Sequence, residues 1–328
     1  MTGSTPSMGM LLAALLIDRL MGDPAWLWAR LAHPVALMGR LIARLDMGLN
    51  DPALPDASRW WRGILAVAIL AALGGAVGVV LELAAASIPF GFALEALLVA
   101  IFLAQKSLID HVSDVAQKLI ARGLPSGRDA VARIVGRDVS VLDEAGVARA
   151  AIESAAENFS DGLVAPALWY ALLGLPGLLV FKLANTADSM IGHRTPKHEA
   201  FGWAAARLDD LLNIVPARLA ALFIAAAAAL TGRDAGAALR IALQDAPQHR
   251  SPNAGWPEAA AAGALGLALG GPRRYGETAL DGAWLNPAGR RSAGAPDIHA
   301  ATRLIDAAWA LVAATVGIIA AIVLWIGR

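Results

Sequence analysis

The sequence predicts an all-α, polytopic integral membrane protein in which amphipathic helices and polar loops form a membrane-proximal site. Hydrophobic residues make up 57% of the chain and charged residues 16%, whereas charged residues make up about 25% of soluble domains. Several apolar runs approach the roughly 20 residues that cross a bilayer as a helix. No stretch of useful length alternates apolar and polar residues as a strand does. No linker or internal repeat stands out, so residues 1–328 are predicted to form a single domain.

Six apolar segments are candidates for membrane spans. The regular ones are residues 63–81, 162–181 and 307–327. Residues 9–20, 88–104 and 211–230 are less regular, and each contains at least one charged residue. The lone acids Glu82 and Glu95 are expected near span ends, because a charge at the bilayer centre is costly.

Two helices are expected in the polar stretch from Lys106 to Asp161. Apolar residues recur at helical spacing from Leu108 to Ile120, and Gly123 with Pro125 ends this first helix. Ser140 and Asp143 fit a capping box, so a second helix is expected from Ser140 toward Phe159.

The apolar run 162–181 contains the helix-breaking sequence Gly174-Leu-Pro-Gly177. Arginine or lysine occurs in every long loop, and the positive-inside rule would place all of these loops on the cytoplasmic side. Such a topology requires that some segments enter and leave the membrane by the same face. Residues 162–181 are therefore expected to form a broken or re-entrant segment, whose irregular backbone is covered by protein or lines a polar cavity.

Carboxylates precede this run at a spacing of four residues. Glu153, Glu157 and Asp161 would share one helix face, where they are candidates for Mg²⁺ ligands or a general base. The alternative is an exposed face whose acids pair with Arg133 and Arg149.

A second polar cluster follows the run. Asn185 and Asp188 lie three residues apart after Lys182, and His193 and Arg194 come directly after Gly192. Arginine presents a two-pronged cation to phosphate or carboxylate. A helix cap with snorkelling interfacial residues is the alternative.

A third cluster lies at the start of the apolar segment 211–230 and in the residues just before it. It contains Trp203, Arg207, Asp209, Asp210 and Asn213. An ion pair within the helix, from Arg207 to Asp210, would explain part of it. Two adjacent aspartates entering an apolar segment favour function over structure.

Two proline-rich pieces complete the candidates. Asp23 and His33 each precede a proline, which holds them in an extended conformation, and Arg40 follows. Asn253 and Trp256 lie in a rigid loop that leads into a helix. For each piece, a purely structural cap or turn is the alternative.

Several classes of site are missing from the chain. Without cysteine it has no disulfide or thiolate site. No Walker A, dinucleotide-binding, H-E-x-x-H or nucleophile-elbow motif occurs. Lysine plus arginine equals aspartate plus glutamate at 27 each, and no nucleic-acid partner is expected.

Five segments together resemble the CobD/CbiB family of cobalamin biosynthesis, the adenosylcobinamide-phosphate synthases. They are DRLMGDP (18–24), HPVALMGRLI (33–42), GRDVSVLDEAGVARAAIESAAENFSDGLVAP (136–166), KLANTADSMIGHRTPKHEAFGWAAARLDDLLNIVPAR (182–218) and SPNAGWPEAAAAGALGLALGG (251–271). They span nearly the whole chain in order, and the middle ones are specific.

The resemblance implies an amide-forming ligase that joins aminopropanol, or its O-phosphate, to a propionate carboxylate of adenosylcobyric acid. ATP and Mg²⁺ would activate the acid, and the corrinoid would be a substrate. We expect a multi-pass protein of the cell (inner, cytoplasmic) membrane. A homo-oligomer, or a complex with other corrinoid-pathway enzymes, is compatible with this assignment.

Residue roles follow from placing that chemistry on the clusters. The predicted catalytic residues are Glu157, Asp161, Asp188 and Asp209. The predicted metal ligands are Glu153, Glu157, Asp188, Asp209, Asp210 and Asn213. The predicted substrate contacts are Asp23, His33, Arg40, Lys182, Asn185, His193, Arg194, Trp203, Arg207, Asn253 and Trp256.

Two other functions remain open at this point. A Mg²⁺-dependent membrane prenyltransferase or alcohol-phosphate transferase also places Asp and Asn on helices, but with repeated Asp at four-residue spacing that this chain only approximates. A transporter of a polar anion would use a broken helix and buried charges, and it would favour internal repeats.

Overall fold

The chain divides into two compact units, each assembled from separate stretches of sequence. The computed structural model describes residues 8–275, 278–280 and 282–327. Unit 1 comprises Met1–Ala104, Ala165–Asn213 and Val316–Arg328, and unit 2 comprises Gln105–Val164 and Ile214–Thr315. That residues 1–328 form a single domain stays a prediction.

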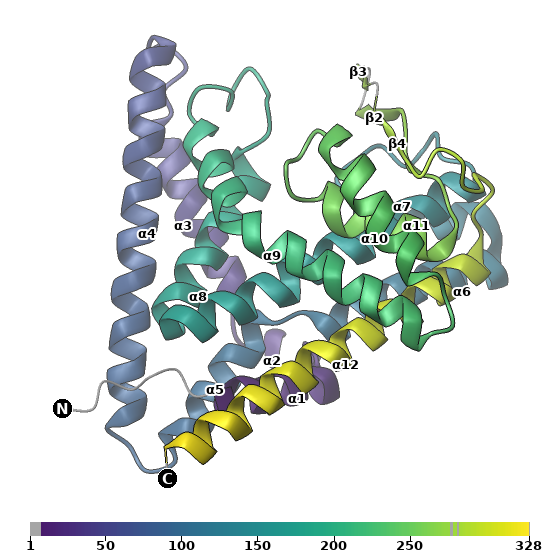
Figure 1. Ribbon diagram of the computed structural model, residues 1–328. Coiled ribbons are helices and arrows are strands. Elements are labelled where there is room, and N and C mark those ends of the chain that lie inside the picture. Colours follow the sequence, from purple (N-terminus) through teal and green to yellow (C-terminus); the bar gives the residue numbers. More distant parts are fainter. Residues whose placement is uncertain (1–7, 276–277, 281, 328) are drawn as a thin grey trace. The chain divides into compact units, whose positions relative to one another are not determined.

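Helices dominate both units (Figure 1). Unit 1 contains α1 (Met8–Met21), α2 (Ala25–Trp28), α3 (Pro34–Leu49), α4 (Asp56–Ala86), α5 (Gly91–Phe102) and α8 (Ala165–Ile191). Unit 2 contains α6 (Gln105–Val131), α7 (Glu144–Phe159), the π-helix η1 (Ser160–Val164), α10 (Ala235–Asp245), the 3₁₀-helix η2 (Ala246–Gln248) and α11 (Gly255–Leu265). Helices α9 (Trp203–Leu230) and α12 (Ala295–Ile326) carry residues of both units.

The described residues of unit 2 include four short strands, too little to alter the predicted all-α class. β1 (Leu269–Gly270) pairs with β4 (Trp284–Leu285), and β2 (Arg273–Tyr275) pairs with β3 (Thr278–Leu280), both antiparallel. Each strand is only two or three residues long. The two strand pairs join neighbouring loop segments of unit 2 by backbone hydrogen bonds.

The central contact of unit 1 joins α4 to α8, which lie side by side in Figure 1. Glycines allow this close approach: a Cβ atom on Gly78 would lie 2.4 Å from the backbone of Pro176. A Cβ atom on Gly74 would lie 2.8 Å from the Leu183 side chain. Small residues at helix contacts are typical of membrane bundles, where dispersion replaces the hydrophobic effect.

Helix α8 is broken where the sequence predicts it. Gly174 has φ 66° and ψ −154°, a conformation that glycine adopts readily. The Glu82 carboxylate of α4 accepts a hydrogen bond from the Leu175 amide at 2.8 Å, so the freed backbone is satisfied by protein. Glu95 likewise accepts a hydrogen bond from the hydroxyl of Tyr170 at 2.7 Å.

Helix α9 continues through Pro216 without a break. Proline has no amide hydrogen, so it cannot donate to the carbonyl of Leu212 four residues earlier. The indole of Trp169 on α8 donates to that carbonyl instead, at 3.1 Å. The acceptor that the proline leaves free is thereby satisfied.

The helices of unit 2 confirm one predicted boundary and correct another. The first predicted helix does stop at Gly123, where φ is 73°, but α6 resumes beyond it to Val131. Ser140 does not begin the second helix, because Asp143 caps it by accepting from the Gly146 amide at 2.6 Å. Ser140 instead donates to Asp138 in the preceding turn.

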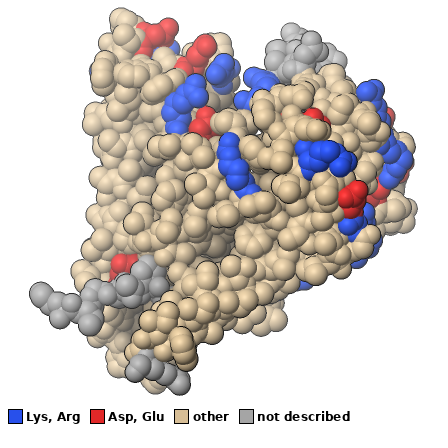
Figure 2. Space-filling view, in the orientation of Figure 1, with Lys and Arg blue, Asp and Glu red and all other residues tan. Residues whose placement is uncertain are grey.

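Among the described residues, five helical segments are long and apolar enough to cross a membrane: Asp56–Ala86, Gly91–Val131, Glu144–Ile191, Trp203–Leu230 and Ala295–Ile326. Large apolar side chains of α4, such as Leu73, Val80 and Leu83, are exposed, and Figure 2 shows its surface as mostly uncharged. Such a surface suits lipid. The predicted segment 9–20 lies in α1, whose 14 residues are too short to span. The protein is a multi-pass membrane protein.

Candidate functional site

A buried network of amides and one carboxylate joins α8 to α9 in unit 1. The side-chain nitrogen of Asn185 donates to one oxygen of Asp209 at 3.1 Å. The side-chain nitrogen of Asn213 donates to the other oxygen at 3.1 Å. Asp209 is 8% exposed and Asn213 1% exposed. Three residues from two of the predicted clusters therefore meet inside the helices.

The network leaves one acceptor unsatisfied. The side-chain oxygen of Asn213 is buried and has no hydrogen-bond partner within the described part of the chain. Its orientation is fixed, because the amide nitrogen must face the carboxylate of Asp209. A buried unpaired acceptor is costly and indicates a missing donor or cation.

Asp188 lies beside this network, at the end of α8. A Cβ atom on Gly192 would lie 1.9 Å from Oδ1 of Asp188, so only glycine leaves room for the carboxylate there. Asp188 is near enough to interact electrostatically with Asp209. Asp210 turns to Arg207 instead, at 3.5 Å, which is the ion pair within the helix that the sequence offers as an alternative.

The other predicted residues of this region lie around the network. Lys182 is 9% exposed on α8, and its carbonyl accepts from the Thr186 hydroxyl at 2.6 Å. His193 and Arg194 are exposed in the loop after α8. Trp203 packs on Trp60 with ring centroids 5.0 Å apart, so it belongs to an aromatic contact with α4.

Sequence reasoning missed the polar cluster that fixes this loop. Asp46 of α3 accepts from Lys197 at 2.6 Å, from His198 at 3.3 Å and from Asn50 at 2.8 Å. Arg59 of α4 donates to Asn50 at 3.0 Å and to the carbonyl of Lys197. Burial alone would raise the pKa of Asp46, but these hydrogen bonds lower it below its usual value. The only sequence signal was the adjacent pair Lys197-His198.

The N-terminal candidates Asp23 and His33 contact each other. Nε2 of His33 lies 3.4 Å from Oδ1 of Asp23. Nδ1 of His33 accepts from the Val35 amide at 3.2 Å, so His33 caps α3, as the structural alternative holds. Trp28 packs edge-on against the imidazole at 4.4 Å. Arg40 is exposed on α3.

The carboxylates of α7 in unit 2 have different surroundings from one another. Glu153 is buried and accepts from Arg137 at 2.8 Å and from the Gly270 amide at 2.8 Å. Of the basic residues offered as alternative partners, Arg133 lies 3.9 Å from Asp114, and Arg149 donates to the carbonyl of Arg291 at 2.6 Å. Glu157 is exposed, and Asp161 is half-buried within the π-helix η1. The wider π turn moves Asp161 away from a strict four-residue face.

Asn253 and Trp256 both contact Arg218, a charged residue within the apolar segment 211–230. Arg218 of α9 donates to the side-chain oxygen of Asn253 at 2.8 Å. Its guanidinium lies 4.7 Å from the centroid of the Trp256 ring. Arg218 thus fixes the loop that leads into α11.

The metal prediction rests on few protein ligands. Within residues 8–275, 278–280 and 282–327, no group of three or more His, Asp or Glu side chains is arranged to hold a metal ion. The oxygen donors of the α8–α9 network are one carboxylate and amide groups. The metal assignments for Glu153, Glu157, Asp188, Asp209, Asp210 and Asn213 stay predictions.

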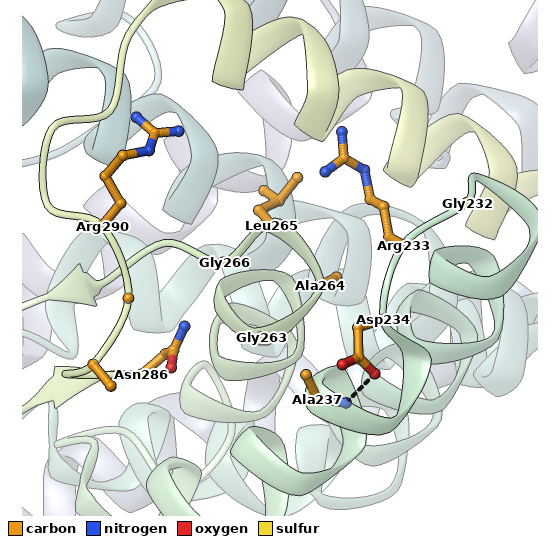
Figure 3. A pocket seen from close by; sticks show the side chains of 12 residues that line it. Gly232, Arg233, Asp234, Ala237, Gly263, Ala264, Leu265, Gly266, Asn286 and Arg290 are labelled. Carbon is orange, nitrogen blue, oxygen red and sulfur yellow. Dashed lines mark hydrogen bonds between the residues drawn. The ribbon is translucent and has the colours of Figure 1, made fainter.

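A separate cavity of about 530 Å³ opens in unit 2 (Figure 3). Arg233, Asp234, Asn286 and Arg290 are among its lining residues. Asp234 caps α10 through the Ala237 amide at 2.8 Å, and Arg290 pairs with Asp297 at 2.6 Å. The cavity contains none of the predicted site residues.

Known proteins resemble the chain over most of its length. The family model described as CobD/Cbib protein matches residues 11–305. A Sinorhizobium sp. protein named "Cobalamin biosynthesis protein CobD" is 56% identical over 88% of this chain and 90% of its own. A Brucella suis protein of the same name is 51% identical over 94% of each chain.

No solved structure gives a significant match. The family model and these relatives agree with the five segments quoted from the sequence, and they cover both units. The chain belongs to the CobD/CbiB family.

Proposed function

We propose that this protein acts in cobalamin biosynthesis as an amide-forming ligase. It joins aminopropanol, or its O-phosphate, to a propionate carboxylate of adenosylcobyric acid. Membership in the CobD/CbiB family and relatives named for cobalamin biosynthesis support the pathway. The observation that carries the site is the buried Asn185–Asp209–Asn213 network with an unsatisfied Asn213 oxygen.

The residues of this network suit a hard cation. Mg²⁺ prefers oxygen ligands and binds through one or two carboxylates, with water and substrate phosphates completing its shell. Asp209 and the free oxygen of Asn213 supply oxygens, and Asp188 lies beside them. Asp209 and Asn213 would hold the ion, which when bound with ATP would neutralise phosphate charge.

The remaining roles are to accept a proton from the amine and to bind the anionic groups of the substrates. An amine attacks an activated carboxyl only after it loses a proton, and a carboxylate such as Asp188 is suited to accept that proton. The exposed side chains of His193 and Arg194 follow Asp188 in the chain and suit contacts with phosphate or corrinoid carboxylates. Lys197 and His198 hold the same loop to α3 through Asp46.

The site of action that we propose is the inner (cytoplasmic) membrane. Five apolar helical segments among the described residues support membrane insertion. Soluble ATP and the corrinoid would reach polar loops at that surface.

The test is mass spectrometry of the detergent-purified full chain incubated with adenosylcobyric acid, aminopropanol phosphate, ATP and Mg²⁺. A product heavier by the amine minus water, formed only with ATP, supports the ligase. Asp209→Asn should reduce product formation at least 100-fold, because it removes the negative charge of the carboxylate to which the side chains of Asn185 and Asn213 donate. Asp129→Asn, on the exposed side of α6, is the matched control and should leave the rate unchanged.

A transporter is the second candidate, because α8 is broken at Gly174 inside an apolar segment. It would bind the corrinoid and leave its mass unchanged. Folded wild-type protein that binds the corrinoid without ligation would therefore overturn the ligase proposal.

A further inference from the structure

Unit 2 contains a cluster of two arginines around one tryptophan, which the proposed ligase chemistry does not use. The Trp284 cluster consists of Trp284, Arg149 and Arg291. Cζ of Arg291 lies 4.5 Å and Cζ of Arg149 5.6 Å from the centroid of the indole. Arg149 also donates to the carbonyl of Arg291 at 2.6 Å. The two guanidinium groups are thus held against the same ring.

A hydrogen-bonded frame positions this cluster. Trp284 on β4 pairs with Gly270 on β1, and the Gly270 amide donates to Glu153 at 2.8 Å. Glu153 lies one helical turn after Arg149 on the same helix α7. A Cβ atom on Gly271 would lie 2.6 Å from the indole, so glycine lets the backbone approach the ring. These contacts therefore fix the position of the indole against which the two arginines pack.

Among the described residues, the positive charge of the cluster is not neutralised by an ion pair with a neighbouring carboxylate. In the part of the chain that the structure describes, no carboxylate forms an ion pair with Arg149 or Arg291. The nearby acids are engaged: Glu153 pairs with Arg137 at 2.8 Å, and Asp297 pairs with Arg290 at 2.6 Å. Two like charges held together repel each other, and a bound anion removes that repulsion.

We propose that the Trp284 cluster binds a phosphate group. The planar, fork-shaped donors of arginine match phosphate oxygens with two parallel hydrogen bonds. The phosphate belongs either to a soluble phosphoester or to the headgroup of an anionic phospholipid, which basic and aromatic residues at a membrane surface bind. This assignment is independent of the ligase reaction.

Native mass spectrometry of the detergent-purified full chain tests it with two probes, pyrophosphate and phosphatidylglycerol. The variant pair Arg149→Gln/Arg291→Gln should weaken binding of at least one probe on the order of tenfold or more, because charge-assisted hydrogen bonds are lost. The matched control is Arg122→Gln/Arg240→Gln, which removes two exposed arginine charges from the same unit. It should bind as the wild type does.

The two probes identify the source of the phosphate. A loss confined to pyrophosphate assigns a soluble phosphoester, and a loss confined to phosphatidylglycerol assigns a lipid headgroup. Equal binding by both variant pairs overturns the proposal. Should the glutamine pair fail to fold, Arg291→Lys keeps the charge without the planar fork. Folded Arg291→Lys protein with unchanged binding of both probes overturns it equally.

Discussion

The contact between α4 and α8 predicts different effects on stability for alanine at two glycines of the same helix. A Cβ atom on Gly78 would lie 2.4 Å from the backbone of Pro176, well inside the 3.0 Å below which such contacts essentially never occur. A Cβ atom on Gly75 would meet only the Val180 side chain, at 4.0 Å. Gly78→Ala therefore forces two helices apart, and Gly75→Ala does not.

The size of the difference follows from two terms. Alanine gains about 1 kcal/mol of helix propensity over glycine at either position, so this term cancels between the variants. Overpacking costs about 1–3 kcal/mol, and at Gly78 it falls on backbone atoms that cannot rotate away. Gly78→Ala should therefore be about 1–3 kcal/mol less stable than Gly75→Ala.

Unfolding of the purified protein by SDS in mixed micelles, followed by tryptophan fluorescence, measures this difference. The two variants share one helix and one chemical change, so each serves as the reference for the other. Equal unfolding midpoints for Gly78→Ala and Gly75→Ala would show that the helices do not approach as closely as described.

Three further predictions concern the polar contacts. Glu153→Gln should destabilise the protein by about 2–4 kcal/mol in the same unfolding measurement, because it leaves Arg137 buried without its counter-charge. The hydrogen bonds to Asp46 hold its pKa in the folded protein below the ordinary value of 3.8. The stability that ionised Asp46 contributes should therefore be present above pH 3.8 and be lost as the pH falls through the lowered pKa. Thermal unfolding measured against pH should show this loss for the wild type and not for Asp46→Asn. Gly192→Ala should reduce ligation about 100-fold by displacing the Asp188 carboxylate, as product mass spectrometry would measure.

Each of these three predictions has its own control and contrary result. A double variant that replaces both Glu153 and Arg137 by apolar residues should recover stability, and a failure to recover it would assign the loss to the Gly270 contact. Persistence of the acid-dependent loss in Asp46→Asn would contradict the role given to Asp46. Gly136→Ala, whose Cβ atom would meet nothing within 4 Å, should retain full ligation. Unchanged ligation by Gly192→Ala would show that the position of Asp188 is not critical.

Features determined by local sequence were predictable. The apolar segments 63–81 and 211–230 lie in α4 and α9, and the break at Gly174 is where a glycine and a proline interrupt an apolar run. Asp209 and Asn213 contact each other because they lie one turn apart on a single helix. Periodicity and turn chemistry are sufficient for such cases.

Features that depend on distant pairing were not predictable. Asp46 is 151 residues from its partner Lys197, and Glu153 is 117 residues from the Gly270 amide. Each of these acids had closer basic residues in the sequence, and only the packing of helices and loops selects among them. The helix start at Asp143 was missed for a local reason, because two capping residues competed within one turn.

The tryptophan that replaces the missing amide of Pro216 also determines how stiff α9 is. Leu212 and Asn213 lie within one turn of this proline on α9. A helix that lacks one rung of its ladder bends there more readily than elsewhere. Trp169 donates to the free carbonyl of Leu212 from the neighbouring helix α8, and so supports α9 at this turn. Asn213, whose side-chain oxygen has no hydrogen-bond partner among the described residues, follows Leu212 directly, so a ligand bound at that oxygen would contact the same turn of α9.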